Sequence, residues 1–109
     1  PKEPVFKCGE SGVLTFTTWG YADRVEVIFP EAMTALDPTL NRIYDYTETP
    51  GYRITEELPF MVPLYTPENR ELEITVRAYK GDKKLEDHPT ISVIGVSGTV
   101  LDELRTRLR

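Results

Sequence analysis

The chain of 109 residues contains only one cysteine, Cys8, and only one histidine, His88. A single cysteine excludes a disulfide bond within the chain, and we interpret Cys8 as a buried or idle thiol. One cysteine and one histidine are too few for a structural zinc site in a single chain. Asp37, Asp45 and Glu48 offer oxygen ligands close together in sequence, but without the spacing of a calcium-binding loop. We therefore predict no metal site and no cofactor.

Long hydrophobic segments and an excess of basic residues are also missing. No apolar run approaches the roughly 18 residues that cross a bilayer, so we expect no direct membrane insertion. The first residues lack an initiator methionine and a signal-peptide core, which indicates an excised or processed segment. With 13 basic and 18 acidic residues the net charge is −5, which opposes binding to nucleic acid or to anionic membranes. We therefore predict no nucleic-acid partner.

The strongest pattern that is present is the alternation of a β-hairpin. Apolar residues alternate with polar ones over 72–79, and they alternate again over 90–94. Between these segments lies Lys80-Gly81-Asp82-Lys83, in which Gly81 can adopt the positive φ of a two-residue hairpin turn. We therefore predict two antiparallel strands with one buried face and one solvated face.

The first half of the chain shows the same strand pattern, interrupted by turns and prolines. The remaining elements are predicted in this order: strands over 5–7, 13–18 and 24–29, a short helical turn or loop over 31–36, a brief strand over 42–46, and a strand over 58–65 that its prolines confine to an edge or interrupt with a bulge. The apolar members of the alternating runs form the predicted core: Leu14, Phe16, Val25, Val27, Ile74, Val76 and Val93.

Two segments fall outside this strand pattern. Residues 37–52 are polar, acidic and bracketed by prolines, so we expect them to bury little and to be the most mobile ordered part of the chain. Residues 99–109 begin with a loose capping box, and their apolar side chains fall on one helical stripe. We predict one domain over 1–98, followed by a short amphipathic helix or tail over 99–109.

Three strand-like stretches, 12–18, 23–29 and 73–82, follow one another with a hairpin closing the last pair. Their order resembles that of immunoglobulin-like and fibronectin type III-like modules, particularly those of bacterial secreted and cell-surface proteins. The resemblance implies an all-β fold, an Ig-like antiparallel β-sandwich of about seven strands, here with a short C-terminal helix. The chain departs from antibody domains because it lacks their cysteine pair, and because Trp19 stands at the end of a predicted strand.

The sequence offers no arrangement of residues that is typical of catalysis. His88 lies between Asp87 and Pro89 with no nucleophile placed for a hydrolase triad, so we interpret it as a turn residue. Glu71 and Glu73 are neighbours on one strand, whereas a glycosidase needs two carboxyl groups that face each other across a cleft. A solvated face with cross-strand charge pairs is the better interpretation. We predict that the chain is not an enzyme.

Aromatic residues in or beside predicted turns are the remaining candidates for a binding site. These candidates are Trp19, Tyr21, Tyr44, Tyr46 and Tyr52. Such rings stack on sugars or anchor protein interfaces. The alternative is structural: the rings cover the end of the core and keep their polar tips in water.

Taken with the resemblance, these features favour a noncatalytic Ig-like module of a larger extracellular or cell-surface bacterial protein. Its role would be that of a spacer or a protein-interaction domain. The expected partners are other domains of the parent protein or a separate protein. The alternative is a carbohydrate-binding β-sandwich module that uses the loop aromatics.

Overall fold

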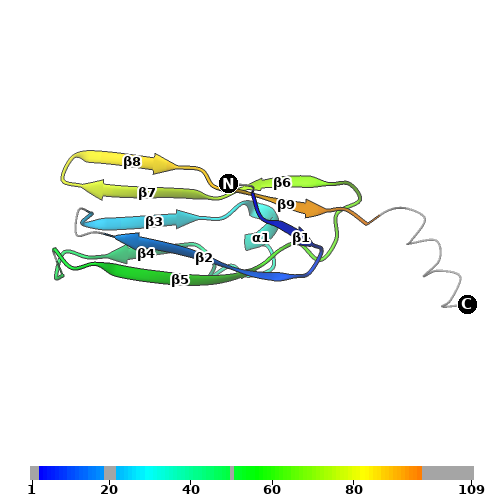
Figure 1. Cartoon of the computed structure of the whole chain (residues 1–109), viewed down its shortest axis with the longest axis horizontal. Helices are drawn as coiled ribbons and strands as arrows, with labels where there is room; N and C mark the ends of the chain where they lie inside the picture. The colour runs from blue at the N-terminus through cyan, green and yellow to red at the C-terminus, as the bar shows by residue number, and fades with distance from the viewer. Residues whose placement is uncertain (1–2, 19–21, 50, 97–109) are drawn as a thin grey trace, which may run out of the picture.

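The computed structural model describes residues 3–18, 22–49 and 51–96, and these residues form an all-β fold (Figure 1). The elements are β1 Val5–Lys7, β2 Ser11–Thr18, β3 Arg24–Ile28, α1 Glu31–Thr34, β4 Arg42–Asp45, β5 Ile54–Met61, β6 Arg70–Glu73, β7 Thr75–Lys80, β8 Lys83–Asp87 and β9 Thr90–Ile94. The predicted all-β class, dominated by antiparallel pairing, is confirmed. The predicted helix over 99–109 lies outside the described residues.

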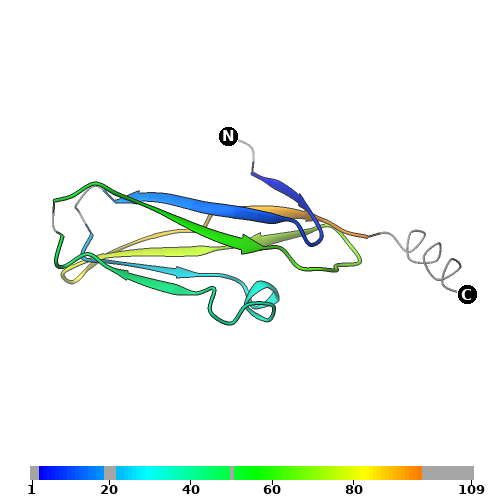
Figure 2. The same cartoon turned by 90° about the horizontal axis from the view of Figure 1, so that it is seen from below.

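The strands pair into sheets that lie in two layers (Figure 2). In one layer β2 and β5 pair antiparallel along all eight residues of each strand. In the other, the order is β4-β3-β7-β8, and every neighbouring pair is antiparallel. A third group has the order β1-β9-β6, in which the short β1 runs parallel to β9.

The last four strands form one long hairpin. Lys80 pairs with Lys83 beside the turn, and Arg70 pairs with Val93 at the far end, without any change of register between them. Gly81 has a φ of +58°, as a two-residue turn that begins with glycine requires. The ladder is interrupted at Pro89, which has no N–H to donate, although its carbonyl accepts the N–H of Ile74 at 2.9 Å. The predicted hairpin is therefore confirmed. Its single interruption divides one side into β6 and β7 and the other into β8 and β9, which gives nine strands where about seven were expected.

One strand of this hairpin was not predicted. In β8, over Lys83–Asp87, all five residues are exposed, and so the sequence shows no alternation between apolar and polar positions there. Periodicity detects a strand only where one face is buried. The strand forms because β7 supplies a complete partner ladder next to a tight turn.

The core lies between the layers and contains the residues that alternation predicted. Val25, Val27, Ile74 and Val93 are buried, while Leu14, Phe16 and Val76 are half-buried and pack against them. The other fully enclosed side chains are Met33, Leu58 and Val62. Met33 belongs to α1, which confirms the predicted helical turn after β3.

The expectation that residues 37–52 bury little is wrong. Leu40 and Tyr46 are 2% and 6% exposed. The brief strand predicted over 42–46 is confirmed as β4, which pairs antiparallel with β3. The two aspartates of this segment form hydrogen bonds within their own turns: Asp37 and Asp45 each accept hydrogen bonds from a threonine two residues later. These turns expose the acidic residues while the apolar ones point inward. The mobility of the segment stays a prediction.

The proline-rich strand also begins earlier than predicted. β5 starts at Ile54 rather than at Leu58, and its inward positions alternate through Leu58 to Phe60. Alternation did not predict this start, because the charged residue Glu56 occupies one of the inward positions, where an apolar residue is expected. Among the described residues β5 pairs only with β2, which confirms its predicted edge position and accommodates Pro59.

Candidate functional site

Three of the five aromatic candidates lie within the described residues. Tyr44 belongs to β4, Tyr46 follows that strand directly, and Tyr52 precedes β5. Trp19 and Tyr21 lie outside the described residues. The structure brings Tyr44 and Tyr46 together, with ring centroids 6.4 Å apart and planes 7° from parallel. Tyr52 is 66% exposed and has no contact with another aromatic ring of the described part of the chain.

Tyr46 is a core residue rather than an accessible loop ring. Its backbone N–H donates to the carbonyl of Asp23 at 2.7 Å, which prolongs the β3–β4 pairing beyond Asp45. Because strand positions alternate, Tyr44 and Tyr46 point to the same inward face. Across the layers the ring of Phe16 meets Tyr44 edge-on at 5.4 Å. The aromatic rings here therefore close the gap between the two sheets at this end of the sandwich.

The hydroxyl groups of this cluster are held in their neutral form. Burial raises the pKa of Tyr44 and of Tyr46, and the neighbouring Glu56 carboxylate raises both pKa values further. The Oη atom of Tyr46 is buried and has no hydrogen-bond partner among the described residues. A closed, neutral phenol of this kind serves packing and offers little to a polar ligand.

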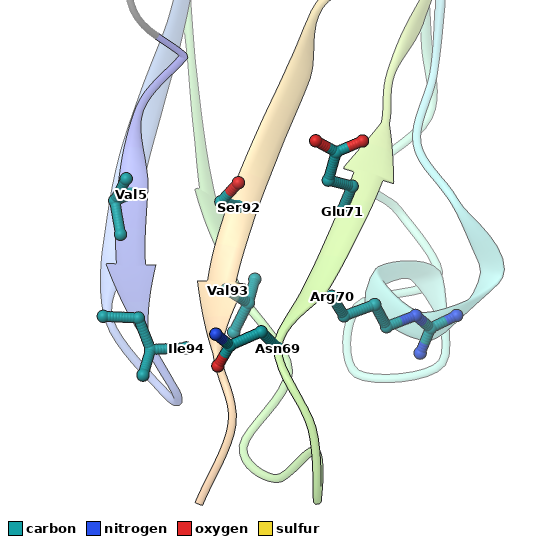
Figure 3. Close-up of a pocket in the computed structure, with 7 residues that line it drawn as sticks. All are labelled: Val5, Asn69, Arg70, Glu71, Ser92, Val93 and Ile94. Carbon is teal, nitrogen blue, oxygen red and sulfur yellow. The ribbon is translucent and has the colours of Figure 1, made fainter.

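An open hollow in the described surface lies at the other end, across β1, β9 and β6 (Figure 3). Its volume is about 400 Å³, and its lining residues are Val5, Asn69, Arg70, Glu71, Ser92, Val93 and Ile94. Figure 3 shows Val5 and Ile94 on one side, with the Glu71 carboxylate beyond Ser92. Val5 and Ile94 are 62% and 45% exposed. An open, largely apolar hollow with charged groups beside it suits the side chains of a protein partner.

Sequence reasoning did not single out this hollow, although one signal was available. Val93 was assigned to the core, and strand side chains alternate between faces. Ile94 must then point outward, as the structure shows. An outward isoleucine at the end of the strand predicted over 90–94 could therefore have been expected. The contribution of Val5 was not, because it depends on the parallel pairing of β1 with β9.

A ladder of charged and polar contacts covers the outer face of the hairpin. Arg77 contacts Glu86 at 2.6 Å and Glu26 at 3.4 Å, which confirms the predicted cross-strand charge pairs. The hydrogen bond from Arg77 holds the pKa of Glu86 below its usual value. Farther along, Nδ1 of His88 lies 3.0 Å from the carboxylate of Glu73. His88 thus sits beside an ordinary acidic neighbour, at the point where the ladder is interrupted between β8 and β9.

A carboxylate also fastens the start of the chain to this face. Glu3 accepts hydrogen bonds from the hydroxyl groups of Thr90 and Ser92. The bond from Ser92, followed by that from Thr90, lowers the pKa of Glu3. Together with the β1–β9 pairing, this contact fixes the strand that forms one wall of the hollow.

The described residues hold no group of three or more histidine, cysteine, aspartate or glutamate side chains arranged around a common point for a metal ion. Asp37 and Asp45, considered above as calcium ligands, each bond to their own turn. Within residues 3–18, 22–49 and 51–96, no helix has the length and apolarity that a membrane span requires.

The function of this chain has to be inferred from the geometry of the site, because comparison with known proteins gives no match. No family model, curated protein or solved structure matches the chain.

Proposed function

We propose that the chain is a noncatalytic Ig-like module of a larger extracellular or cell-surface bacterial protein, with a spacer or protein-interaction role. The observation that carries the proposal is the pairing pattern of the strands. β2 pairs with β5 in one layer, β4-β3-β7-β8 form the other, and β1 runs parallel beside β9.

This pattern agrees with the strand order of immunoglobulin-like sandwiches. In those folds the second and fifth strands share one sheet, while the third, sixth and seventh form the other, with an added strand beside the third. Here β2 and β5 take the former places, and β3 with the two halves of the long hairpin takes the latter. β4 occupies the place of the added strand.

The surface supports an interaction role better than a catalytic one. The hollow at β1, β9 and β6 combines exposed Val5 and Ile94 with the charged groups of Arg70 and Glu71. Apolar centres with polar surroundings are typical of protein interfaces. The neighbouring domain of the parent protein, or a separate protein, is the partner that fits this surface.

The location is tested by protease treatment of intact bacterial cells that produce the full-length parent protein. We expect external protease to release fragments that carry this chain, while a cytoplasmic marker protein stays intact. Fragments that appear only after the cells are lysed would contradict an extracellular location.

The interaction role is tested by substituting a residue that lines the hollow. Ile94→Glu should weaken binding of the chain to the adjoining part of its parent protein, measured by calorimetry, because it places a charge among apolar groups. Ile43→Glu, on the exposed edge strand β4, is the matched control. Equal affinities of both variants and of the unaltered chain would refute the assignment of this hollow.

The alternative, a carbohydrate-binding module, is supported by the exposed ring of Tyr52. A sugar that stacks on such a ring changes its fluorescence and that of nearby aromatic residues. A panel of soluble glycans should therefore quench the fluorescence of the unaltered chain but not that of Tyr52→Ala. If no glycan in the panel changes the fluorescence, the interaction module is favoured over this alternative.

A further inference from the structure

We propose that the free edge of β8 is a self-association site, at which two copies of the chain pair antiparallel about a two-fold axis through Leu85. The strand reads Lys83-Lys84-Leu85-Glu86-Asp87, with two bases before the leucine and two acids after it. An antiparallel pairing centred on Leu85 places Lys83 opposite Asp87 of the second copy. It also places Lys84 opposite Glu86 and one Leu85 opposite the other. Every charged residue of the strand then faces its opposite charge.

The edge of β8 is available for such pairing. β8 is the last strand in the order β4-β3-β7-β8, and no further strand pairs with it among the described residues (Figure 1). Exposed strand edges carry unpaired backbone groups that accept another strand. The free stretch is limited, because β1 and Glu3 occupy the same side of the hairpin from Thr90 onward. A window of five residues therefore remains for a second copy.

The backbone of β8 directs its free N–H and C=O groups to the free edge at the residues that this register requires. Lys80 and Lys83 flank the two-residue turn, and the closing pair of such a turn is hydrogen-bonded. Hydrogen-bonded and non-hydrogen-bonded pairs alternate along an antiparallel ladder. Lys84 and Glu86 consequently direct their N–H and C=O groups away from β7, toward the free edge. In the proposed dimer these two residues form the hydrogen-bonded pairs across the axis.

The side chains on the axis also fit. In the proposed register the two Leu85 residues form a non-hydrogen-bonded pair, in which side chains approach most closely. Leu85 is 78% exposed in the single chain, the highest value among its large hydrophobic residues whose exposure is described. It borders a small apolar hollow of about 110 Å³ with Ala22 and Ala78. Pairing would cover this leucine, and would join two four-stranded sheets into one of eight strands.

The pairing is specific for a second copy because of its charge pattern. A strand with bases at one end and acids at the other complements itself only when antiparallel. A register shift of two residues, which keeps the backbone hydrogen-bonding pattern, brings like charges together, with Lys84 opposite Lys84 or Glu86 opposite Glu86. Five residues bury less area than a standard interface, so we expect weak association that is visible at high protein concentration. Salt should weaken it further, since the charged pairs are exposed at the rim. The proposal does not depend on the extracellular role argued above.

The test is sedimentation equilibrium of the full chain over a range of concentrations, with folding checked by circular dichroism. We expect a monomer–dimer equilibrium for the unaltered chain. Leu85→Lys should lower the association constant by about tenfold or more, because two ammonium groups then meet on the axis. Ile43→Lys, on the opposite edge of the same sheet, should leave the constant unchanged.

A charge-reversal pair tests the register itself. Lys83→Asp puts like charges opposite Asp87, and Asp87→Lys puts like charges opposite Lys83, so each variant alone should associate less than the unaltered chain. Mixed together, the two variants restore opposite charges at both ends and should form a heterodimer. A chain that stays monomeric at all concentrations would overturn the proposal. So would a dimer that Leu85→Lys leaves intact, or a mixture of the reversed variants that does not associate.

Discussion

Ile74 and Val76 stand two positions apart on one side of the long hairpin, but they differ in burial. Ile74 is 1% exposed, whereas Val76 is only half-buried at the flank of the core. Ile74 lies between the ends of β6 and β7, whereas Val76 lines a hollow in the surface together with Phe16 and Ala22. Burial at single positions therefore determines which substitutions the fold tolerates.

We expect Ile74→Ala to lower the free energy of unfolding by about 2 to 5 kcal/mol, because it removes a buried side chain and leaves a cavity. Val76→Ala should cost less, since solvent already reaches that side chain. Ile43→Ala, at an exposed position of β4, should stay within about 0.5 kcal/mol of the unaltered chain. Urea denaturation measures all three. Equal losses for Ile74→Ala and Ile43→Ala would contradict the packing described here.

At Tyr46, in contrast to these apolar positions, a polar atom is buried without a hydrogen-bond partner among the described residues. Its Oη atom has no hydrogen bond within the described residues, and an unpaired buried hydroxyl carries a desolvation penalty. We expect Tyr46→Phe to keep or raise stability, by up to about 1 kcal/mol, because it keeps the ring and removes the unpaired atom.

The matched control for this change is Tyr52→Phe, at an exposed ring, which should leave the thermal midpoint unchanged. Tyr46→Ala should cost about 3 to 5 kcal/mol, since the aromatic cluster loses a ring. A loss of stability above about 1 kcal/mol in Tyr46→Phe would show that the hydroxyl has a partner in solution, such as an ordered water.

At the scale of elements, the end of β9 is fixed by the segment that enters β6. The N–H of Gly95 donates to the side chain of Asn69 at 2.9 Å, and the N–H of Val96 donates to the carbonyl of Thr66 at 2.8 Å. A Cβ atom at Gly95 would come within 2.6 Å of the Cα atom of Glu68. Backbone therefore meets backbone here, and only a glycine leaves enough space.

We expect Gly95→Ala to lower stability by about 1 to 3 kcal/mol, because the methyl group forces the two segments apart. Amide hydrogen exchange should also become faster at Gly95 and Val96, whose hydrogen bonds hold the segments together. Ile94→Ala, at the exposed neighbouring position, is the control and should leave these amides protected. Unchanged stability and exchange in Gly95→Ala would mean that the segments are not in contact in solution.

For the whole molecule, acid acts on several surface contacts at once, because these contacts depend on ionised carboxyl groups. Among the described residues, five carboxyl groups have pKa values below their usual values of 4.5 for glutamate and 3.8 for aspartate: Glu3, Asp23, Asp37, Asp45 and Glu86. In each, hydrogen bonds to the ionised form are the main cause. A group whose pKa is lowered by folding stabilises the fold above its unfolded pKa, and that contribution is lost as the pH falls through its folded pKa.

We therefore expect the thermal midpoint to change little between pH 7 and pH 5 and to fall steadily below pH 4.5, measured by circular dichroism. Glu3→Gln should lower the midpoint at pH 7 and should show a smaller further fall in acid. Glu57→Gln, an exposed position on β5, should follow the unaltered chain. A midpoint that rises between pH 5 and pH 3 would reverse the sign of the argument.

The local features of the fold could be predicted from the sequence because they depend on neighbouring residues. Alternation over 72–79 and a glycine at position 81 were enough to predict the hairpin, and the turn then set the register of the whole ladder. The inward valines of β3 followed from the same rule. In each case the physical cause, a two-residue side-chain period or a positive φ, acts within a few residues.

The tertiary structure alone decided the features that depend on distant partners. The parallel pairing of β1 with β9 joins residues about 87 positions apart, and it creates both the hollow at Val5 and the contacts of Glu3. Tyr46 became a core residue because β4 pairs with β3, not because of its polar neighbours. β8 forms as a wholly exposed strand because β7 lies beside it. Such positions carry no periodic signal, since their environment is supplied by segments that only folding brings together.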